Sequence, residues 1–157
     1  MRKIILVFIL GLAGSVITFS QDFNAIPTDK QISELPDGWY KFKMQGVVFD
    51  VELKQGKYKK GNITWFDGSS YSGDLNGTYL SGRGTYTWSN GSQYLGNFKR
   101  HQRHGRGTLV AKDGSKWSGK WKNNQKNGKG TTFDSYGVAI NSGVWVGGEL
   151  IEKNNTK

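Results

Sequence analysis

The chain has 157 residues and a formal net charge of +10, with 22 Lys and Arg residues against 12 Asp and Glu residues. Only two prolines accompany the 23 glycines, which excludes a collagen triple helix, and an aromatic content of 13% excludes a disordered low-complexity chain. The absence of cysteine excludes disulfide scaffolds, thiolate metal sites and cysteine nucleophiles.

The first predicted element is a secretory signal peptide over residues 1–20. Two basic residues precede an apolar run over residues 4–17, and Thr18 and Ser20 are small residues at the two cleavage-site positions. A membrane-spanning helix needs roughly 20 apolar residues, so this run is short for one, and an uncleaved N-terminal anchor is the alternative. We expect cleavage near Ser20 and an exported protein that is periplasmic, outer-membrane-associated or secreted.

Two further segments follow before the central part of the chain. Residues 21–38 are predicted to be a flexible polar lead, because Pro27 and Pro36 break any helix. Residues 39–66 contain short strand-like runs separated by Gln-Gly turns, which predicts a β-meander. We expect this meander to cap the N-terminal edge of a larger sheet, since an exposed strand edge invites aggregation.

The strongest pattern in the chain is a period of 23 residues. Turn glycines follow this period at Gly68, Gly91, Gly114 and Gly137. The same 23-residue step separates the copies of four other features. These are an aromatic side chain, a glycine two residues later, a second large apolar side chain and a Gly-x-Gly pair. A fixed period of this length predicts a repeat architecture in which each unit is one supersecondary element.

Each 23-residue unit is predicted to be a β-hairpin. In the middle unit Tyr94, Gly96 and Phe98 alternate with period two, and a second alternation starts at Gly105. Residues 99–104 between the two runs are expected to form a polar loop. The units are joined by Asn-Gly or Asp-Gly dipeptides, which favour tight turns because both residues tolerate a positive φ.

Within each predicted strand the glycines and the aromatic side chains fall on one face. Because glycine has no Cβ, a large ring is expected to lie flat over its backbone, so that a single sheet buries apolar surface without a covering helix. The predicted aromatic and glycine layer comprises Tyr71, Gly73, Gly82, Gly84, Tyr94, Gly96, Phe98, Gly105, Gly107, Trp117, Gly119, Trp121, Gly128 and Gly130. Tyr86 and Trp88 are expected to extend this layer.

This arrangement resembles the MORN repeat (membrane occupation and recognition nexus), whose pattern is aromatic-x-Gly-x-aromatic, a short loop, Gly-x-Gly and a turn glycine. The resemblance covers three repeats over residues 67–134, in which His101 and Asn124 replace the family's loop glycine. Residues 135–152 resemble a degenerate C-terminal capping repeat, followed by a tail over residues 153–157. The resemblance implies an all-β fold of stacked hairpins in one elongated antiparallel sheet, used as a non-catalytic scaffold. Some members of the family are associated with membranes or phospholipids.

No combination of residues in the chain predicts catalysis, a metal site or a cofactor. The two histidines, His101 and His104, lie among arginines in a predicted loop, where positive charge opposes cation binding. Aspartates beside the turn glycines are expected to bond backbone amides, and no helix follows the Gly-x-Gly pairs to make them phosphate loops. We therefore expect no enzyme activity, no cofactor and no metal.

Positive charge is concentrated in the repeats. Residues 67–134 contain eleven basic and four acidic side chains. Arg83, Arg106 and Lys129 recur in register on the face opposite the aromatic side chains, roughly 10 Å apart if each repeat adds two strands. Two further basic clusters are expected at the loop edges, one of Lys99, Arg100 and Arg103 and one of Lys120, Lys122 and Lys126.

These features leave two function hypotheses open. The first is an exported, non-catalytic scaffold or protein–protein interaction module of the cell envelope, whose partner is another envelope or secreted protein. The second is peripheral binding of anionic phospholipid head groups or acidic glycan through the basic face. The aromatic face is a rival site for sugars or extended peptides, although we expect it to be the core. Export argues against a nucleic-acid partner.

Overall fold

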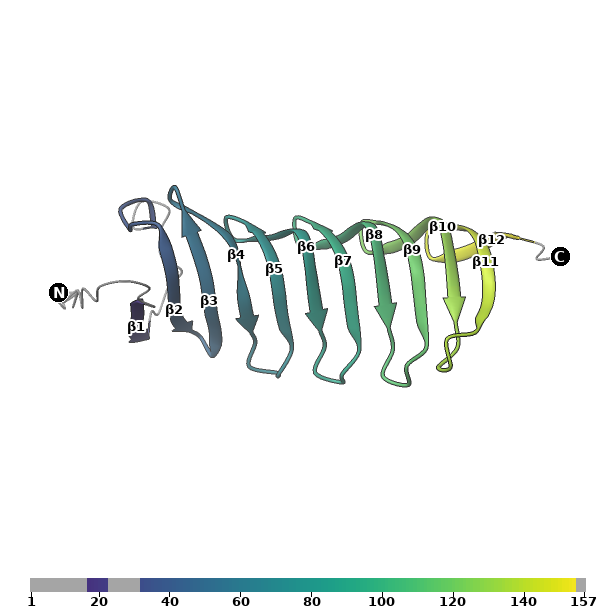
Figure 1. Cartoon of the computed structure of the whole chain (residues 1–157), viewed down its shortest axis with the longest axis horizontal. Coiled ribbons are helices and arrows are strands. Elements are labelled where there is room, and N and C mark those ends of the chain that lie inside the picture. The colour runs from purple at the N-terminus through teal and green to yellow at the C-terminus, as the bar shows by residue number, and fades with distance from the viewer. Residues whose placement is uncertain (1–16, 23–31, 155–157) are drawn as a thin grey trace.

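The described residues form one open sheet of twelve strands that follow one another in sequence order (Figure 1). The computed structural model describes residues 17–22 and 32–154. The strands are β1 (Ile17–Asp22), β2 (Gly38–Met44), β3 (Val47–Lys54), β4 (Lys57–Thr64), β5 (Ser70–Asn76), β6 (Tyr79–Thr87), β7 (Gln93–Lys99), β8 (Gln102–Val110), β9 (Lys116–Lys122), β10 (Gln125–Phe133), β11 (Ala139–Val146) and β12 (Glu149–Lys153). Neighbours from β2 to β12 pair antiparallel, whereas β1 pairs with β2 in parallel. The prediction of one elongated antiparallel sheet of hairpins is confirmed from β2 onwards.

The N-terminal end of the sheet is more ordered than the sequence predicts. Ile32 is buried, and the Tyr40 hydroxyl donates a hydrogen bond to the Pro36 carbonyl at 2.7 Å. The backbone N–H of Gln55 donates to an Asp37 carboxylate oxygen at 2.7 Å. Residues 32–38, the last part of the predicted flexible lead, are therefore held on the sheet by a buried apolar side chain and by hydrogen bonds.

The predicted signal peptide lies largely outside the described residues. Strand β1 extends across the predicted cleavage position near Ser20. No helix formed by the described residues is long and apolar enough to cross a membrane.

At the other end of the sheet, β11 and β12 form the last hairpin. The backbone N–H of Asn154 donates to the Ser142 carbonyl at 2.7 Å, so the predicted tail is held to the sheet as far as residue 154. Residues 155–157 lie outside the described part of the chain.

The turns that join the strands along one long side of the sheet have two residues each. The connection within residues 99–104 is therefore shorter than the predicted loop. The φ angles are 48° at Arg100 and 66° at His101, and 49° at Asn123 and 68° at Asn124 in the next repeat. Two successive residues with positive φ are typical of a type I′ hairpin turn, whose twist matches that of the flanking strands. Strand pairing therefore resumes at once, and the polar residues that follow the turn belong to β8.

The turns along the opposite long side of the sheet have more residues, and their backbone geometry also differs from the prediction. Gly91 has a φ of 86°, whereas Asn90 does not have a positive φ. The Trp88 N–H donates to the Ser92 carbonyl, and the Ser92 N–H donates to the Asn90 side-chain oxygen, both at 2.9 Å. Asn90 thus closes the turn as a hydrogen-bond acceptor and not through a left-handed backbone.

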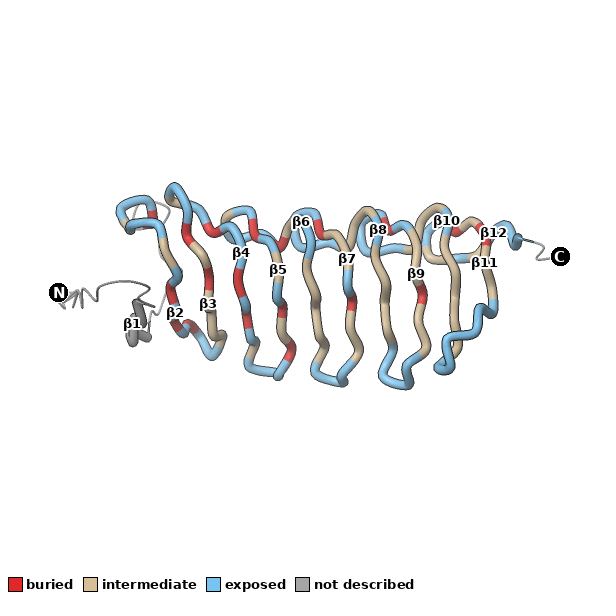
Figure 2. Tube along the Cα trace, in the orientation of Figure 1, coloured by how far each residue is buried: buried red, intermediate tan, exposed pale blue. Residues whose placement is uncertain are grey.

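The core lies on one face of this single sheet. Buried residues, red in Figure 2, recur along the sheet between β2 and β11. They run from Tyr40 in β2 to Trp145 in β11, and Leu53 and Tyr94 have no exposed surface. Among the described residues only 32 and 33 are helical, so no helix of this part of the chain covers the core strands. The buried side chains must therefore shield one another.

Candidate ligand-binding groove

The aromatic face, defined as the face that carries Tyr71, Tyr94 and Trp117, is packed against bare glycine backbone. A Cβ atom added to Gly96 would lie 2.7 Å from the Tyr94 hydroxyl, and one added to Gly107 on the next strand would collide with the same ring. Tyr71 lies in the same way over Gly73 and Gly84, and Trp117 over Gly119 and Gly130. Each of these rings covers a glycine of its own strand and one of the following strand.

The rings of successive repeats contact one another edge to face. Phe98 lies 5.3 Å from Tyr71 and 5.0 Å from Tyr94 between ring centroids, with interplanar angles of 88° and 86°. Trp121 joins Tyr94 to Trp117 in the same way, at 5.3 Å and 5.0 Å. This chain of contacts fills the aromatic face, and edge-to-face pairs add about 0.5–1.5 kcal/mol each beyond their buried area.

Three of the glycines predicted for this layer have another role. The first glycine of each Gly-x-Gly pair, which is Gly82, Gly105 or Gly128, has a positive φ. A Cβ added to Gly105 would approach the Asn97 side chain on the opposite face, 3.1 Å from Nδ2, and not the ring of Tyr94. The strand pairing shifts register beside Gly105, so this glycine forms a β-bulge that a side chain would strain.

Tyr86 and Trp88 lie beside the main row of rings and not within it. Tyr86 contacts Trp65 at 5.4 Å and Trp88 at 4.9 Å between ring centroids. Both side chains are partly buried and pack against the core. They form a second aromatic group near the wide turns.

The predicted basic cluster of Lys99, Arg100 and Arg103 is divided in the structure. The Arg103 guanidinium lies 4.4 Å from the centre of the Trp121 ring and donates a hydrogen bond to the Asn124 carbonyl at 2.9 Å. Burial lowers the pKa of Arg103. Arg103 is therefore part of the aromatic face, whereas Lys99 ends β7 and Arg100 is a turn residue.

Lys126, from the second predicted cluster, also packs over the aromatic rings. Its ammonium lies 4.6 Å from the centre of the Trp145 ring and 5.4 Å from that of Trp117. Burial, and then the positive charge of Arg103, lowers the pKa of Lys126. Two of the expected ligand-binding cations thus stabilise the core by cation–π contact.

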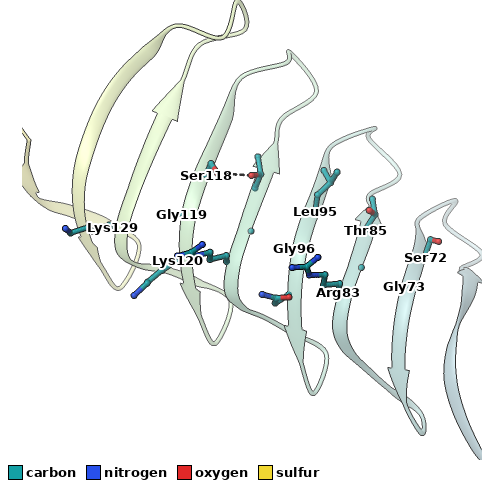
Figure 3. A pocket seen from close by; sticks show the side chains of 15 residues that line it. Ser72, Gly73, Arg83, Thr85, Leu95, Gly96, Ser118, Gly119, Lys120 and Lys129 are labelled. Carbon is teal, nitrogen blue, oxygen red and sulfur yellow. Dashed lines mark hydrogen bonds between the residues drawn. The ribbon is translucent and has the colours of Figure 1, made fainter. Parts of the chain in front are cut away.

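The opposite face, called here the groove face, contains an open groove of about 950 Å³ that spans β5 to β10. Arg83, Arg106 and Lys129 line it, as the sequence places them, and Lys120 lies directly across from Arg106 on the neighbouring strand. Figure 3 shows basic side chains along one side of this groove. Lys120 was assigned to a loop cluster from the sequence, although its two-residue offset from Ser118 places both on one face of a strand.

Hydroxyl side chains line the other side of the groove. They come from Ser72 of β5, Thr85 of β6, Thr108 of β8 and Ser118 of β9, and Thr108 donates to Ser118 at 2.9 Å. Leu95 lies between Thr85 and Thr108 in the strand pairing and is the exception in this row (Figure 3). The groove thus offers charge along one side and hydrogen-bonding groups along the other.

None of the groove cations forms an ion pair with another described residue, since the ion pairs of that part of the chain are those of Glu52 with Lys54 and Lys60. No Asp or Glu lines the groove itself, although the Asp74 carboxylate lies next to Arg83 and accepts a hydrogen bond from its backbone N–H at 2.8 Å. Arg83, Arg106, Lys120 and Lys129 are solvent-exposed. A row of unpaired cations produces a positive potential that attracts anions.

Several other polar residues of the repeats have structural roles. The Ser69 and Ser115 hydroxyls donate to Asp67 and Asp113 at 2.6 Å and 2.7 Å in the wide turns, and these bonds lower the pKa of both carboxyl groups. The His101 ring contacts the Tyr79 ring at 5.1 Å between centroids, with an angle of 51° between the ring planes. No three His, Asp or Glu residues within 17–22 and 32–154 are grouped so that they could hold a metal ion.

Comparison with known proteins agrees with this architecture. The family model of the MORN repeat matches residues 71–93, 94–116 and 117–135. No curated protein matches the chain. Each matched unit starts at one of the three rings that cover the glycine backbone. Residues 71–135 are therefore three consecutive MORN repeats, which indicate a repeat-based module for interaction or membrane binding.

Proposed function

We propose that the protein is an exported, non-catalytic interaction module of the cell envelope that binds an acidic segment of another protein in its groove. The single observation that supports this proposal is the row of exposed cations Arg83, Arg106, Lys120 and Lys129, none of which forms an ion pair with another described residue. The aromatic face is filled by its own rings and bare backbone, so it has little surface left for a ligand. The groove face is the part of the repeats that remains free to bind.

The spacing of the cations suits an elongated partner. Arg83, Arg106 and Lys129 belong to β6, β8 and β10, so successive members are two strands apart. Two strand spacings of ~4.8 Å give roughly 10 Å between them. A partner segment that lies along the sheet and presents acidic side chains at a similar interval would meet one cation per repeat.

Export rests on the N-terminal sequence. Basic residues, an apolar run over residues 4–17 and small residues at Thr18 and Ser20 form the layout of a cleavable signal. N-terminal sequencing of the protein from the envelope fraction tests this part of the proposal. A mature chain that begins at Gln21 supports it, and one that still begins at Met1 contradicts it.

A pull-down from the native envelope fraction tests the interaction. The bait is compared with a variant that carries Arg83→Glu, Arg106→Glu and Lys129→Glu, and with a control that carries Lys57→Glu, Lys112→Glu and Lys153→Glu outside the groove lining. We expect the groove variant to lose the partner by tenfold or more and the control to retain it. The complex should also dissociate at ~1 M salt, where the Debye length is about 3 Å. Equal recovery by both variants would contradict the proposal.

A second candidate is binding of anionic phospholipid or acidic glycan in the same groove. The observation that favours it is the row of hydroxyl groups from Ser72 to Ser118, which can hydrogen-bond sugar or head-group oxygens beside the cations. Pelleting with anionic and with neutral vesicles, and binding to an acidic polysaccharide, test this candidate. Equal pelleting with both vesicle types and no retention on the polysaccharide would exclude it.

A further inference from the structure

The row of hydroxyl groups in the groove is interrupted at one position. The residues at 23-residue steps are Ser72, Leu95 and Ser118, and all three line the groove. Leu95 therefore breaks the repeat pattern in the middle of the array. With 44% of its surface exposed, it is also the only groove-lining residue among the exposed large hydrophobic side chains of the described chain.

Leu95 is surrounded by polar groups of the two adjacent strands. Thr85 of β6 and Thr108 of β8 lie opposite it in the strand pairing, and it belongs to β7 between them. Arg83 and Arg106 lie two residues before these threonines on the same two strands, on the basic side of the groove. An apolar side chain is thus placed between two threonines and across the groove from two cations that are roughly 10 Å apart.

The partner-binding role proposed above leaves the nature of the partner segment open, and Leu95 narrows it. A head group or a sugar chain gains little from an exposed leucine, because its polar oxygens would lose water without a hydrogen bond in return. A protein segment can bury an aliphatic or aromatic side chain there while its carboxylates meet the two arginines. Any acidic polymer would satisfy the charge complementarity of the groove. Leu95 is therefore the residue that favours a peptide over a head group or a sugar chain.

We propose that Leu95 is a specificity-determining contact of the groove, which selects acidic protein segments with an apolar side chain between two acidic ones. This inference rests on the proposed function, because it assumes that a protein segment occupies the groove. Arg83 and Arg106 provide attraction to any anionic chain, and Leu95 adds preference for one kind of sequence.

The test uses two synthetic peptides of equal length and charge. One consists of glutamate and serine, and in the other a central serine is replaced by leucine. Binding to the full chain is measured by fluorescence anisotropy for the wild type and for Leu95→Ser, Arg83→Glu and Ile151→Ser. The Leu95→Ser change copies the residue that the neighbouring repeats contain, so the sheet is expected to retain its fold, which circular dichroism verifies.

We expect the wild type to bind the leucine peptide roughly tenfold more tightly than the serine peptide. Leu95→Ser should remove this preference without changing affinity for the serine peptide, and Ile151→Ser, which removes another exposed aliphatic group, should behave as the wild type. Arg83→Glu should weaken binding of both peptides.

The two proposals fail in different ways. If Arg83→Glu weakens both peptides but Leu95→Ser leaves the leucine preference intact, the role of Leu95 is overturned and the basic groove is supported. If Arg83→Glu leaves both affinities unchanged, or if neither peptide binds the wild type, both proposals are overturned.

Discussion

The ring of Tyr94 occupies the space that a side chain at Gly107 would need, and its hydroxyl donates a hydrogen bond to the Asn97 carbonyl at 3.0 Å. The same relationship joins Tyr71 to Gly84, with a hydroxyl bond of 2.7 Å to the Asp74 carbonyl. The rings of Tyr94 and Tyr71 are buried in a single sheet because one side of each lies against bare backbone and neighbouring side chains cover the rest. The stability of the array depends on the absence of side chains at these glycines.

Substitution of Gly107 by alanine is the most direct test of this arrangement. We expect Gly107→Ala to destabilise the fold by about 1–3 kcal/mol, because the added Cβ collides with the Tyr94 ring. The measurement is urea unfolding followed by tryptophan fluorescence. In a Tyr94→Ala background the same change should cost much less, so the double-mutant cycle isolates the contact. An equal cost in both backgrounds would show that the ring and the glycine are independent.

A substitution at Arg100 is expected to increase the stability of the protein. Arg100 has a φ of 48°, and a left-handed backbone costs an ordinary residue about 1–2 kcal/mol, whereas asparagine tolerates it better. Arg100→Asn copies Asn123 of the next repeat and should stabilise the protein by about 0.5–1 kcal/mol in thermal unfolding. The control Lys99→Asn removes a neighbouring charge outside the turn. If it stabilises the protein equally, charge and not backbone strain is the cause.

Arg103 and Arg106 are expected to have separable roles, although they are three residues apart. Arg103→Ala should lower the free energy of unfolding by about 1–2 kcal/mol, because the guanidinium covers the Trp121 ring. Its effect on groove binding should be negligible. Arg106→Ala should change stability by less than about 0.5 kcal/mol and weaken anionic ligands. Urea unfolding and peptide binding measured on both variants decide this, and the reverse pattern would refute the assignment of faces.

Stability should decrease at alkaline pH. Burial raises the pKa of Tyr94 and of Tyr58 to about 12, whereas an unfolded tyrosine has a pKa of about 10. Between these two pKa values the unfolded chain loses tyrosine protons that the folded chain keeps. The contribution of the two protonated hydroxyls to the free energy of unfolding is therefore complete below pH ~10 and is lost as the pH rises through ~12. Urea unfolding at several pH values measures this loss.

The variant Tyr94→Phe isolates the contribution of that hydroxyl to the alkaline loss. It should be less stable at neutral pH by about 1 kcal/mol through the lost hydrogen bond to Asn97, and its stability should fall less steeply with pH. Tyr136→Phe is the control, because Tyr136 is 92% exposed. An unchanged slope for Tyr94→Phe would contradict the assignment of the alkaline loss to Tyr94.

The architecture could be predicted because a local pattern that is weak in one copy recurs at a fixed interval along the chain. A single Tyr-x-Gly-x-Phe segment is a poor indication of a strand, but three copies in register define a hairpin unit and its stacking. The positions of Arg83 and Arg106 on the groove face followed from the same alternation. These predictions needed only the period of two along a strand.

The errors arise where residues are grouped by their position along the chain. Arg103 and Arg106 are three residues apart in β8 and therefore lie on opposite faces, although the prediction counts both as cations of the groove or of a loop edge. The turn at Arg100 is shorter than the polar composition suggested, because an αL backbone in ordinary residues leaves no local sequence pattern. Lys120 was missed for a related reason, since its cluster was defined by nearness along the chain and not by strand parity.

The repeat period, the hairpin unit and the glycine-to-aromatic correspondence are properties of the sequence alone, because they depend on spacing along the strand. Three features depended on the pairing of strands in space. They are the packing of Arg103 and Lys126 over the rings, the different roles of the two glycines in each Gly-x-Gly pair, and the position of Leu95 across the groove from two arginines. Register shifts and cross-strand neighbours join residues that no fixed interval relates, and only the folded sheet defines them.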